Sequence, residues 1–260
     1  MMLLESKTIT RDNKLDNKFV FLTPAYNCRE EMRQTLFSMF AQSYQNWRAV
    51  IIDDVSNDGT GEFVLDLAKK HGYEDRITVK IRKEKHGETK NTLTEIKEIE
   101  DNEIVCRVDG GDWITENDSL FIINEVYKKY DPAVLWTAHR WAFTDTNISG
   151  QLNLSQQHPN VYTHPWVSSH MKTFRAEKLK RVPESNFKDE DGNWIMIACD
   201  QAVFLPMMHL AMQNKESLIF LPRVCYHYSI DLKKPDLFHN DRSYAQKHSA
   251  EWIRQRGFKA

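Results

Sequence analysis

Two aspartates, Asp109 and Asp112, stand three positions apart, separated by two glycines, directly after the apolar run at residues 104–108. In an α/β domain, a buried strand delivers the residues that follow it to its carboxyl end, where an open sheet leaves its ligand crevice. Carboxylates in such a place suit a hard divalent cation, which takes oxygen ligands and often accompanies a phosphate group. The pattern therefore predicts a Mg²⁺ or Mn²⁺ site that serves phosphate chemistry.

Polar residues also follow two earlier apolar segments. The segment at residues 18–23 leads through Pro24 to Tyr26, and the segment at 47–52 ends at Asp53 and Asp54. Helical patterns at 29–42 and 61–71 separate these strands from each other and from a third strand at 77–81, which is typical of βαβ units and a parallel sheet. Right-handed crossovers bring the carboxyl ends of such strands to one edge, so we expect these acids to converge with the later pair.

The remaining pattern predicts a helix at 89–99, the central strand, a helix at 117–130 and a strand at 133–139. Residues 140–163 follow neither period, and loops of that length are usually functional or mobile. A strand at 172–175, a helix at 194–211, a short strand at 218–224 and a basic helix at 242–256 complete the chain.

Composition excludes several classes of protein. With 260 residues, 41% hydrophobic and 28% charged, the chain can form an ample globular core, and a net charge of −2 argues against a purely electrostatic nucleic-acid binder. From residue 170 onward, however, 15 Lys and Arg stand against 11 Asp and Glu, so that part could face an anion, although a solvated basic surface is the simpler interpretation. The four separated cysteines indicate reduced core residues, and the absence of a membrane-length apolar run predicts a cytoplasmic protein.

The order of these motifs resembles the family two glycosyltransferases of the GT-A fold. The resemblance covers about residues 18–230 and rests on four segments, at residues 23–27, 41–44, 50–60 and 107–113. It implies a Rossmann-like α/β domain with a mostly parallel sheet flanked by helices and a C-terminal extension on the acceptor side. It also implies an inverting transferase that uses a nucleotide-sugar donor, most often a UDP-sugar, with Mn²⁺ or Mg²⁺.

The resemblance assigns roles by matching position. It implies a donor-binding set of Thr23, Ala25, Tyr26, Asp53, Asp54, Asp109 and Gly110. The family's metal motif reads Asp-x-Asp-Asp, whereas this chain places Gly111 where the usual ligand stands. Asp112 could take over that role, Asp109 could act through water, or the enzyme could need the cation less. The alternative without a metal is a purely structural one, in which a glycine turn is followed by an acid that caps a helix.

The family's catalytic base is an acid at the start of a helix, and here Asp200 occupies that place in an apolar segment. Loss of solvation there would raise the pKa of the Asp200 carboxyl and strengthen it as a base. Glu190 and Asp191 are the rival candidates for the base. In the purely structural alternative, Asp200 is only a partly exposed acid on a helix.

Three further assignments concern the second half of the chain. The family's closing segment matches residues 226–231, which implies Asp231 as a metal contact, with His227 either a ligand or a packed strand residue. Acceptor-side candidates are Trp166, Arg175 and Trp194, while His86 and Lys90 either meet the diphosphate or are surface groups.

The predicted organisation is a leader at 1–17, a nucleotide-sugar-binding half at 18–139, an acceptor half of the same domain at 140–241 and a basic helix at 242–260. The acceptor is left open between a glycan, a protein and a hydroxymethylated DNA base, because the second half resembles virus- and bacteriophage-encoded transferases. A sugar nucleotidyltransferase is an alternative, although the loop at 23–27 lacks the Gly-rich basic character which that class needs. A non-catalytic nucleotide-sugar-binding module is the third interpretation. The oligomeric state is not defined by the sequence.

Overall fold

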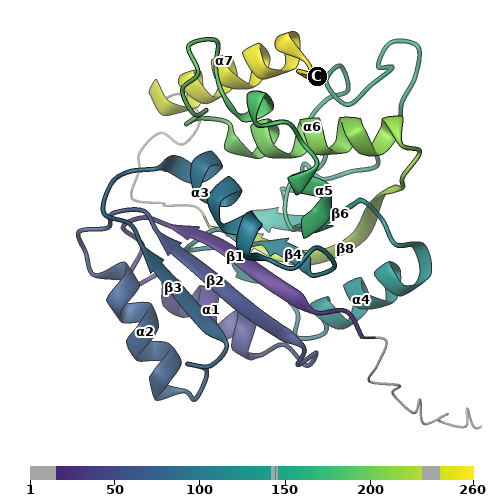
Figure 1. Ribbon diagram of the computed structural model, residues 1–260. Coiled ribbons are helices and arrows are strands. Elements are labelled where there is room, and N and C mark those ends of the chain that lie inside the picture. The colour runs from purple at the N-terminus through teal and green to yellow at the C-terminus, as the bar shows by residue number, and fades with distance from the viewer. Residues whose placement is uncertain (1–15, 142–143, 145, 230–240) are drawn as a thin grey trace, which may run out of the picture.

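The computed structural model describes residues 16–141, 144, 146–229 and 241–260, and one mixed sheet organises them (Figure 1). Its first half alternates strands and helices as predicted. The elements are β1 (Phe19–Ala25), α1 (Met32–Phe40), β2 (Trp47–Asp53), α2 (Thr60–Lys70), β3 (Ile77–Ile81), α3 (Gly87–Glu95), the 3₁₀ turn η1 (Ile96–Glu98) and β4 (Ile104–Arg107). Strands β3, β2, β1 and β4 are neighbours in that order and run parallel.

The second half extends this sheet with strands of both directions. Its elements are β5 (Trp113–Ile114), α4 (Ser119–Tyr130), β6 (Val134–Trp141), β7 (Lys172–Arg175), α5 (Ala176–Lys180), the 3₁₀ turn η2 (Glu184–Phe187), α6 (Cys199–Gln213), β8 (Leu218–Tyr228) and α7 (Asp241–Arg256). Strand β7 pairs antiparallel with both β4 and β6, β8 runs parallel to β6, and β5 closes the edge antiparallel to β8. The fold is thus α/β with a mixed, largely parallel sheet.

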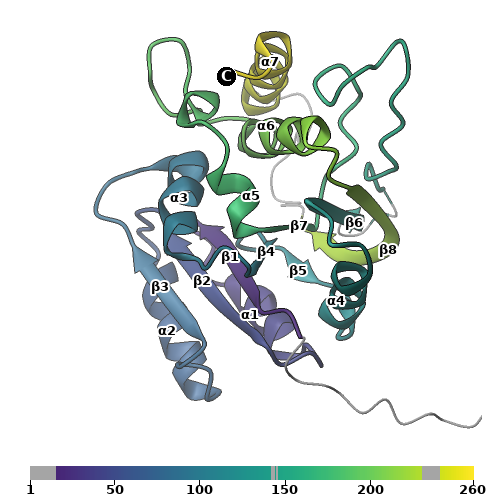
Figure 2. The same ribbon diagram turned by 45° about the vertical axis from the view of Figure 1, so that its right-hand side comes forward.

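Alternating side chains of the central strands divide the core into two layers. Phe19 and Phe21 of β1 pack with α1, α2 and α4, whereas Val20 and Leu22 pack with α3, α5 and α6. Figure 2 shows α1 and α2 on one side of the parallel strands and α3, α5 and α6 on the other. Because both faces are covered, β1 is an unbroken run of buried residues from Phe19 to Leu22.

The main differences from prediction lie in the second half. The predicted helix at 194–211 begins only at Cys199, because Ala198 has a φ of 57° and the left-handed conformation cannot continue a right-handed helix. Strand β8 extends four residues beyond the predicted end, to Tyr228, through its pairing with β6. Among the described residues from 146 to 171 there is no helix or strand, which confirms the irregular segment except at its start, because residues 140–141 belong to β6.

The described helices are all too short or too polar to cross a lipid bilayer.

Candidate active site

A glycine turn places two acids beyond the carboxyl end of β4. The Gly110 amide donates to the Pro24 carbonyl over 2.9 Å, which holds the turn beside the end of β1. A Cβ at residue 110 would lie 2.9 Å from the Cys28 sulfur and 3.0 Å from that carbonyl, so this approach requires glycine. Gly111 has a φ of 100°, which side-chain-bearing residues rarely adopt. The glycines therefore shape the turn that presents Asp109 and Asp112.

Asp112 is tied to the last strand of the sheet. Its side chain is buried, and its two oxygens accept hydrogen bonds of 2.7 Å from the Tyr226 hydroxyl and of 2.7 Å from the Ser229 amide. The same tyrosine oxygen accepts the Asp109 amide over 3.0 Å. No side chain caps the amino end of α4, the helix that follows. The interpretation of Asp112 as a helix-capping acid was therefore wrong, because its partners belong to the β8 segment.

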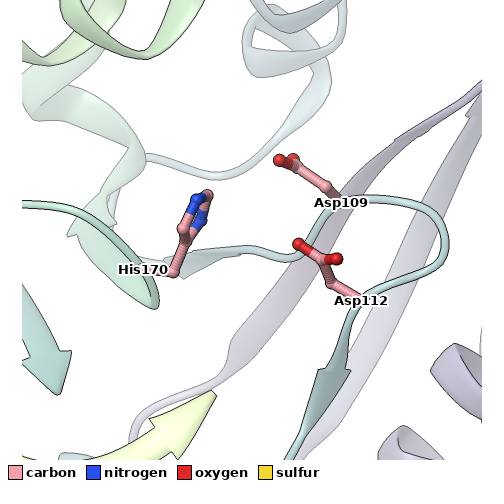
Figure 3. Close-up of side chains that lie close together, drawn as sticks. All are labelled: Asp109, Asp112 and His170. Carbon is pink, nitrogen blue, oxygen red and sulfur yellow. The ribbon is translucent and has the colours of Figure 1, made fainter. Parts of the chain in front are cut away.

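A histidine that the sequence analysis did not select faces these acids. One ligand atom each from Asp109, Asp112 and His170 lies within 4.8 Å of the other two, and Figure 3 shows the three side chains converging. His170 precedes β7, and the antiparallel register pairs Arg107 of β4 with Lys172 of β7. Continuing that register brings residue 170 opposite residue 109. Only knowledge of this non-local strand pairing could have identified the histidine from the sequence.

Asp200, the predicted base, lies beside this group at the start of α6. Its Oδ1 accepts a 2.7 Å ion-paired hydrogen bond from Lys172 Nζ, whose side chain is 1% exposed, while the Asp200 side chain is 31% exposed. Burial alone would raise the pKa of Asp200, but the positive charge of Lys172 and the nearby His170 and Arg107 hold it below its ordinary value. The predicted rise in that pKa was therefore wrong. The prediction considered only the apolar neighbours of Asp200 within its helix and overlooked Lys172, which comes from β7.

Arg107, on β4, supplies the second buried cation of the site. Its guanidinium donates to Glu88 over 2.6 Å and to Asp109 over 3.3 Å. Burial and repulsion between carboxylates raise the pKa of Asp109 and Asp112 above their ordinary value. Burial likewise raises the pKa of Glu88 to about 7.

When fully ionised, this group of side chains carries two negative charges in excess. It consists of Glu88, Asp109, Asp112 and Asp200 against Arg107 and Lys172. Burial is the largest cause of the raised pKa values of Glu88, Asp109 and Asp112, and repulsion between the carboxylates adds to it. A divalent cation between the two aspartates would balance the charge, so the side chains present fit a metal ion of that charge.

Asp53 and Asp54 hold the loops on the donor side. Asp53 accepts hydrogen bonds of 2.8 Å from the amides of Ser56 and Gly61, at the start of α2. Asp54 accepts hydrogen bonds of 2.9 Å from the amides of His86 and Gly87, at the start of α3. Both acids are buried. They stabilise two helix amino termini beside the carboxyl edge of the sheet.

The loop after β1 presents an exposed aromatic face near these acids. The Tyr26 side chain is 53% exposed, and Lys85 Nζ lies 3.0 Å from the centre of its ring. Thr23 is fully buried, and its hydroxyl has no hydrogen-bond partner among the described residues. Ala25 packs against the turn at Gly110. Of the predicted donor set, Tyr26 is therefore the side chain most open to a ligand.

The predicted acceptor residues are placed differently from one another. The Trp166 ring lies 5.6 Å from Lys172 Nζ, beside the Asp200 pair. The Trp194 ring instead covers Lys188 Nζ at 4.9 Å. Arg175 lies at the opposite end of β7 from His170 and donates to Asp131 over 2.7 Å. The structure thus brings Trp166, but not Arg175, to the acidic group.

The remaining candidates lie outside this group of residues. His227 neighbours Tyr226 on β8, so its side chain points to the other face of the sheet, where it packs on Trp113 with ring centres 4.4 Å apart. Asp231 lies outside the described residues. The rival bases Glu190 and Asp191 are both exposed in the loop before α6.

The sequence model of glycosyl transferase family 2 matches residues 20–197, so the chain belongs to that family. The fold is that of the GT-A glycosyltransferases. Among curated relatives, glycosyltransferase GlyA of Streptococcus pneumoniae is 29% identical over 44% of this chain and 15% of its own length. Putative glycosyltransferase EpsE of Bacillus subtilis is 32% identical over 34% of this chain and 30% of its own length. The chain therefore spans less than a third of either relative.

Solved structures share the fold at low sequence identity. S. aureus TarS in complex with UDP-GlcNAc superposes with a TM-score of 0.58 at 15% identity, over 91% of this chain and 71% of that chain. The mannosyltransferase PcManGT from Pyrobaculum calidifontis, in complex with GDP-Man and Mn²⁺, gives a TM-score of 0.58 at 15% identity, over 92% of this chain and 70% of that chain.

Proposed function

We propose that this protein is an inverting, metal-dependent glycosyltransferase that moves a sugar from a UDP-sugar to an acceptor hydroxyl. One observation carries the proposal: a group of carboxylates with excess negative charge, of which Asp112 is buried and Asp109 is partly exposed, lies beside the ion-paired Asp200 at the carboxyl edge of the sheet. Family membership and structural relatives with bound nucleotide-sugars support the donor class. The choice of uridine rests on the family resemblance.

The donor would lie along the carboxyl ends of β1, β2 and β4. The exposed ring of Tyr26 offers a stacking surface for the nucleobase. The buried acids Asp53 and Asp54 keep the flanking loops in place, and Gly110 allows the acidic turn to pack closely against the end of β1. The diphosphate then reaches the two acids of the glycine turn.

Asp109 and Asp112 would hold the divalent cation. When bound, such an ion stabilises the negative charge that gathers on the leaving diphosphate. Arg107 holds Asp109 from behind, and Tyr226 and the Ser229 amide hold Asp112, so both carboxylates are fixed before the donor arrives. Fixed charges of this kind cost little reorganisation during reaction.

Asp200 would accept the proton of the acceptor hydroxyl. Lys172 occupies its Oδ1 and keeps the group ionised, which leaves Oδ2 to receive the proton as the hydroxyl oxygen attacks the anomeric carbon. Attack from the face opposite the nucleotide inverts the configuration in one displacement. Trp166, beside Lys172, would contact the acceptor.

A donor screen tests the proposal. The full chain is incubated with a panel of nucleotide-sugars, with and without Mn²⁺, and thermal stabilisation and nucleotide release are measured. We expect one UDP-sugar to stabilise the protein only with Mn²⁺ and to release UDP. Asp200→Asn should bind this donor but release no UDP, while the exposed control Glu190→Gln should match the wild type.

Three outcomes would contradict the proposal. Pyrophosphate exchange would indicate a sugar nucleotidyltransferase, and donor binding without turnover in the wild type would indicate a binding module. Comparable UDP release by the Asp200→Asn variant would remove that residue from the role of base.

A further inference from the structure

His170 is held rigidly in an aromatic layer behind the acidic turn. The residue is 6% exposed. Its ring stacks on Tyr226, with centres 4.8 Å apart and planes 10° apart, and lies 5.1 Å from the ring of Tyr228. Because Tyr226 also binds Asp112, one tyrosine fixes the position of the imidazole relative to the carboxylate.

No hydrogen bond joins a ring nitrogen of His170 to another described residue, and neither nitrogen is among the fully buried polar atoms without a partner, so the ring edge keeps some access to the space beside it. A second buried histidine shows the usual situation: His139 Nδ1 lies 2.9 Å from the Ser149 hydroxyl, and its Nε2 accepts from the Trp141 indole over 3.2 Å. A neutral imidazole offers a nitrogen lone pair to a metal ion. Figure 3 shows this ring directed at the two aspartates.

The spacing of the three groups suits one shared ion. Their ligand atoms lie within 4.8 Å of one another. In an octahedral site with bonds of about 2.1 Å, neighbouring ligand atoms are about 3 Å apart and opposite ones about 4.2 Å apart. A contraction of about 1–2 Å would therefore bring all three onto one cation. The packing and the hydrogen bonds that hold these three side chains would have to shift only by this distance when the ion binds.

We propose that His170 is the third protein ligand of the ion held by Asp109 and Asp112, and that its imidazole makes the site prefer Mn²⁺ to Mg²⁺. This inference rests on the metal dependence of the proposed function. Mg²⁺ takes oxygen ligands almost exclusively, whereas a first-row transition ion accepts an imidazole nitrogen together with carboxylates. The histidine would supply a third ligand where the chain has Gly111 in place of the family's acid, without adding negative charge to a site that already has an excess.

Pulsed electron paramagnetic resonance tests the ligand directly. The full chain is loaded with MnCl₂ in the presence of UDP, and coupling of the manganese electron spins to ¹⁴N is recorded. We expect ¹⁴N coupling in the wild type and in the control His227→Asn, and its loss in His170→Asn. Absence of ¹⁴N coupling in the Mn²⁺-loaded wild type would overturn the inference even if the variant does not fold. Persistence of the coupling in folded His170→Asn would overturn it as well.

Metal titrations with UDP present give an independent readout. We expect His170→Asn to weaken Mn²⁺ binding about 10-fold or more while Mg²⁺ binding changes little, so the preference for Mn²⁺ falls. Equal losses for both ions, or none, would refute the selectivity. Failure of the proposed function is distinguishable: a wild type that shows ¹⁴N coupling but turns over no nucleotide-sugar would retain the ligand and lose the transferase.

Discussion

Replacing Lys172 with methionine should destabilise the protein through the acid that is left behind. The Lys172 side chain is 1% exposed, and its Nζ lies 2.7 Å from Asp200 Oδ1. Methionine has a similar length and can keep the packing against Phe204, whose ring centre is 4.8 Å from the ammonium group. Removing one partner of a buried ion pair costs about 3–5 kcal/mol, and the 31% exposure of Asp200 places the expected loss near the lower end, at about 3 kcal/mol.

A double-mutant cycle separates this effect from lost packing. Asp200→Asn alone should cost only about 1 kcal/mol, because the amide oxygen still accepts a hydrogen bond from Lys172 and the nearby carboxylates of Glu88 and Asp109 still offset the charge of Lys172. The double variant removes both charges, so its loss should fall short of the sum of the single losses by about 2 kcal/mol. The free energy of unfolding is measured by urea titration at pH 7 with a chelator present, which keeps metal binding out of the comparison.

A second lysine supplies the control for this cycle. Lys178 Nζ donates to Glu216 over 2.8 Å, but Arg181 also binds that carboxylate, over 3.1 Å. Lys178→Met should therefore cost less than about 1 kcal/mol, since Glu216 keeps a partner. A Lys172→Met loss no greater than that of the control, or single losses that simply add, would refute the reasoning.

Three other predictions concern stability and donor binding. Burial alone would raise the pKa of Glu103, but Arg48 and a second cation lower it to about 2. The stabilisation by ionised Glu103 is therefore present above about pH 4.5 and is lost as the pH falls through 2. Glu103→Gln should lower the free energy of unfolding, measured by urea titration, by up to about 3 kcal/mol at pH 7. A loss that does not depend on pH would contradict this reasoning. Gly61→Ala should lower the melting temperature, because the new Cβ would lie 2.8 Å from Asp53 Oδ2. Helix propensity alone would predict the opposite, so a stabilised variant would contradict the role of Asp53 at the start of α2. Tyr26→Ala should weaken UDP binding about 10-fold in calorimetry at an unchanged melting temperature, and unchanged affinity would remove the stacking role.

The parallel half of the fold could be predicted because its information is local. Each strand there is a short apolar run that ends in polar residues, and helices with one apolar face separate the strands. The bounds of β3 agree with the prediction at both ends. The same locality put Asp109 and Asp112 correctly at the carboxyl edge, and the glycines between them follow from the backbone conformation of the turn.

The second half of the site depends on pairings between distant segments, which spacing does not encode. The antiparallel register between β4 and β7 brings His170 opposite Asp109 and brings Lys172 within reach of Asp200. Reasoning from helix neighbours alone therefore overlooked the histidine and gave the wrong direction for the pKa of Asp200. The start of α6 was missed for a different reason, because a left-handed Ala198 has no signature in composition.

Anomalous diffraction above the manganese absorption edge, from crystals grown with UDP and Mn²⁺, tests the central claim most directly. We predict one anomalous peak between the carboxylates of Asp109 and Asp112, in contact with the diphosphate of UDP and on the side of the site where Asp200 lies. A UDP molecule bound away from that turn, or bound there while the manganese peak lies elsewhere, would contradict the account.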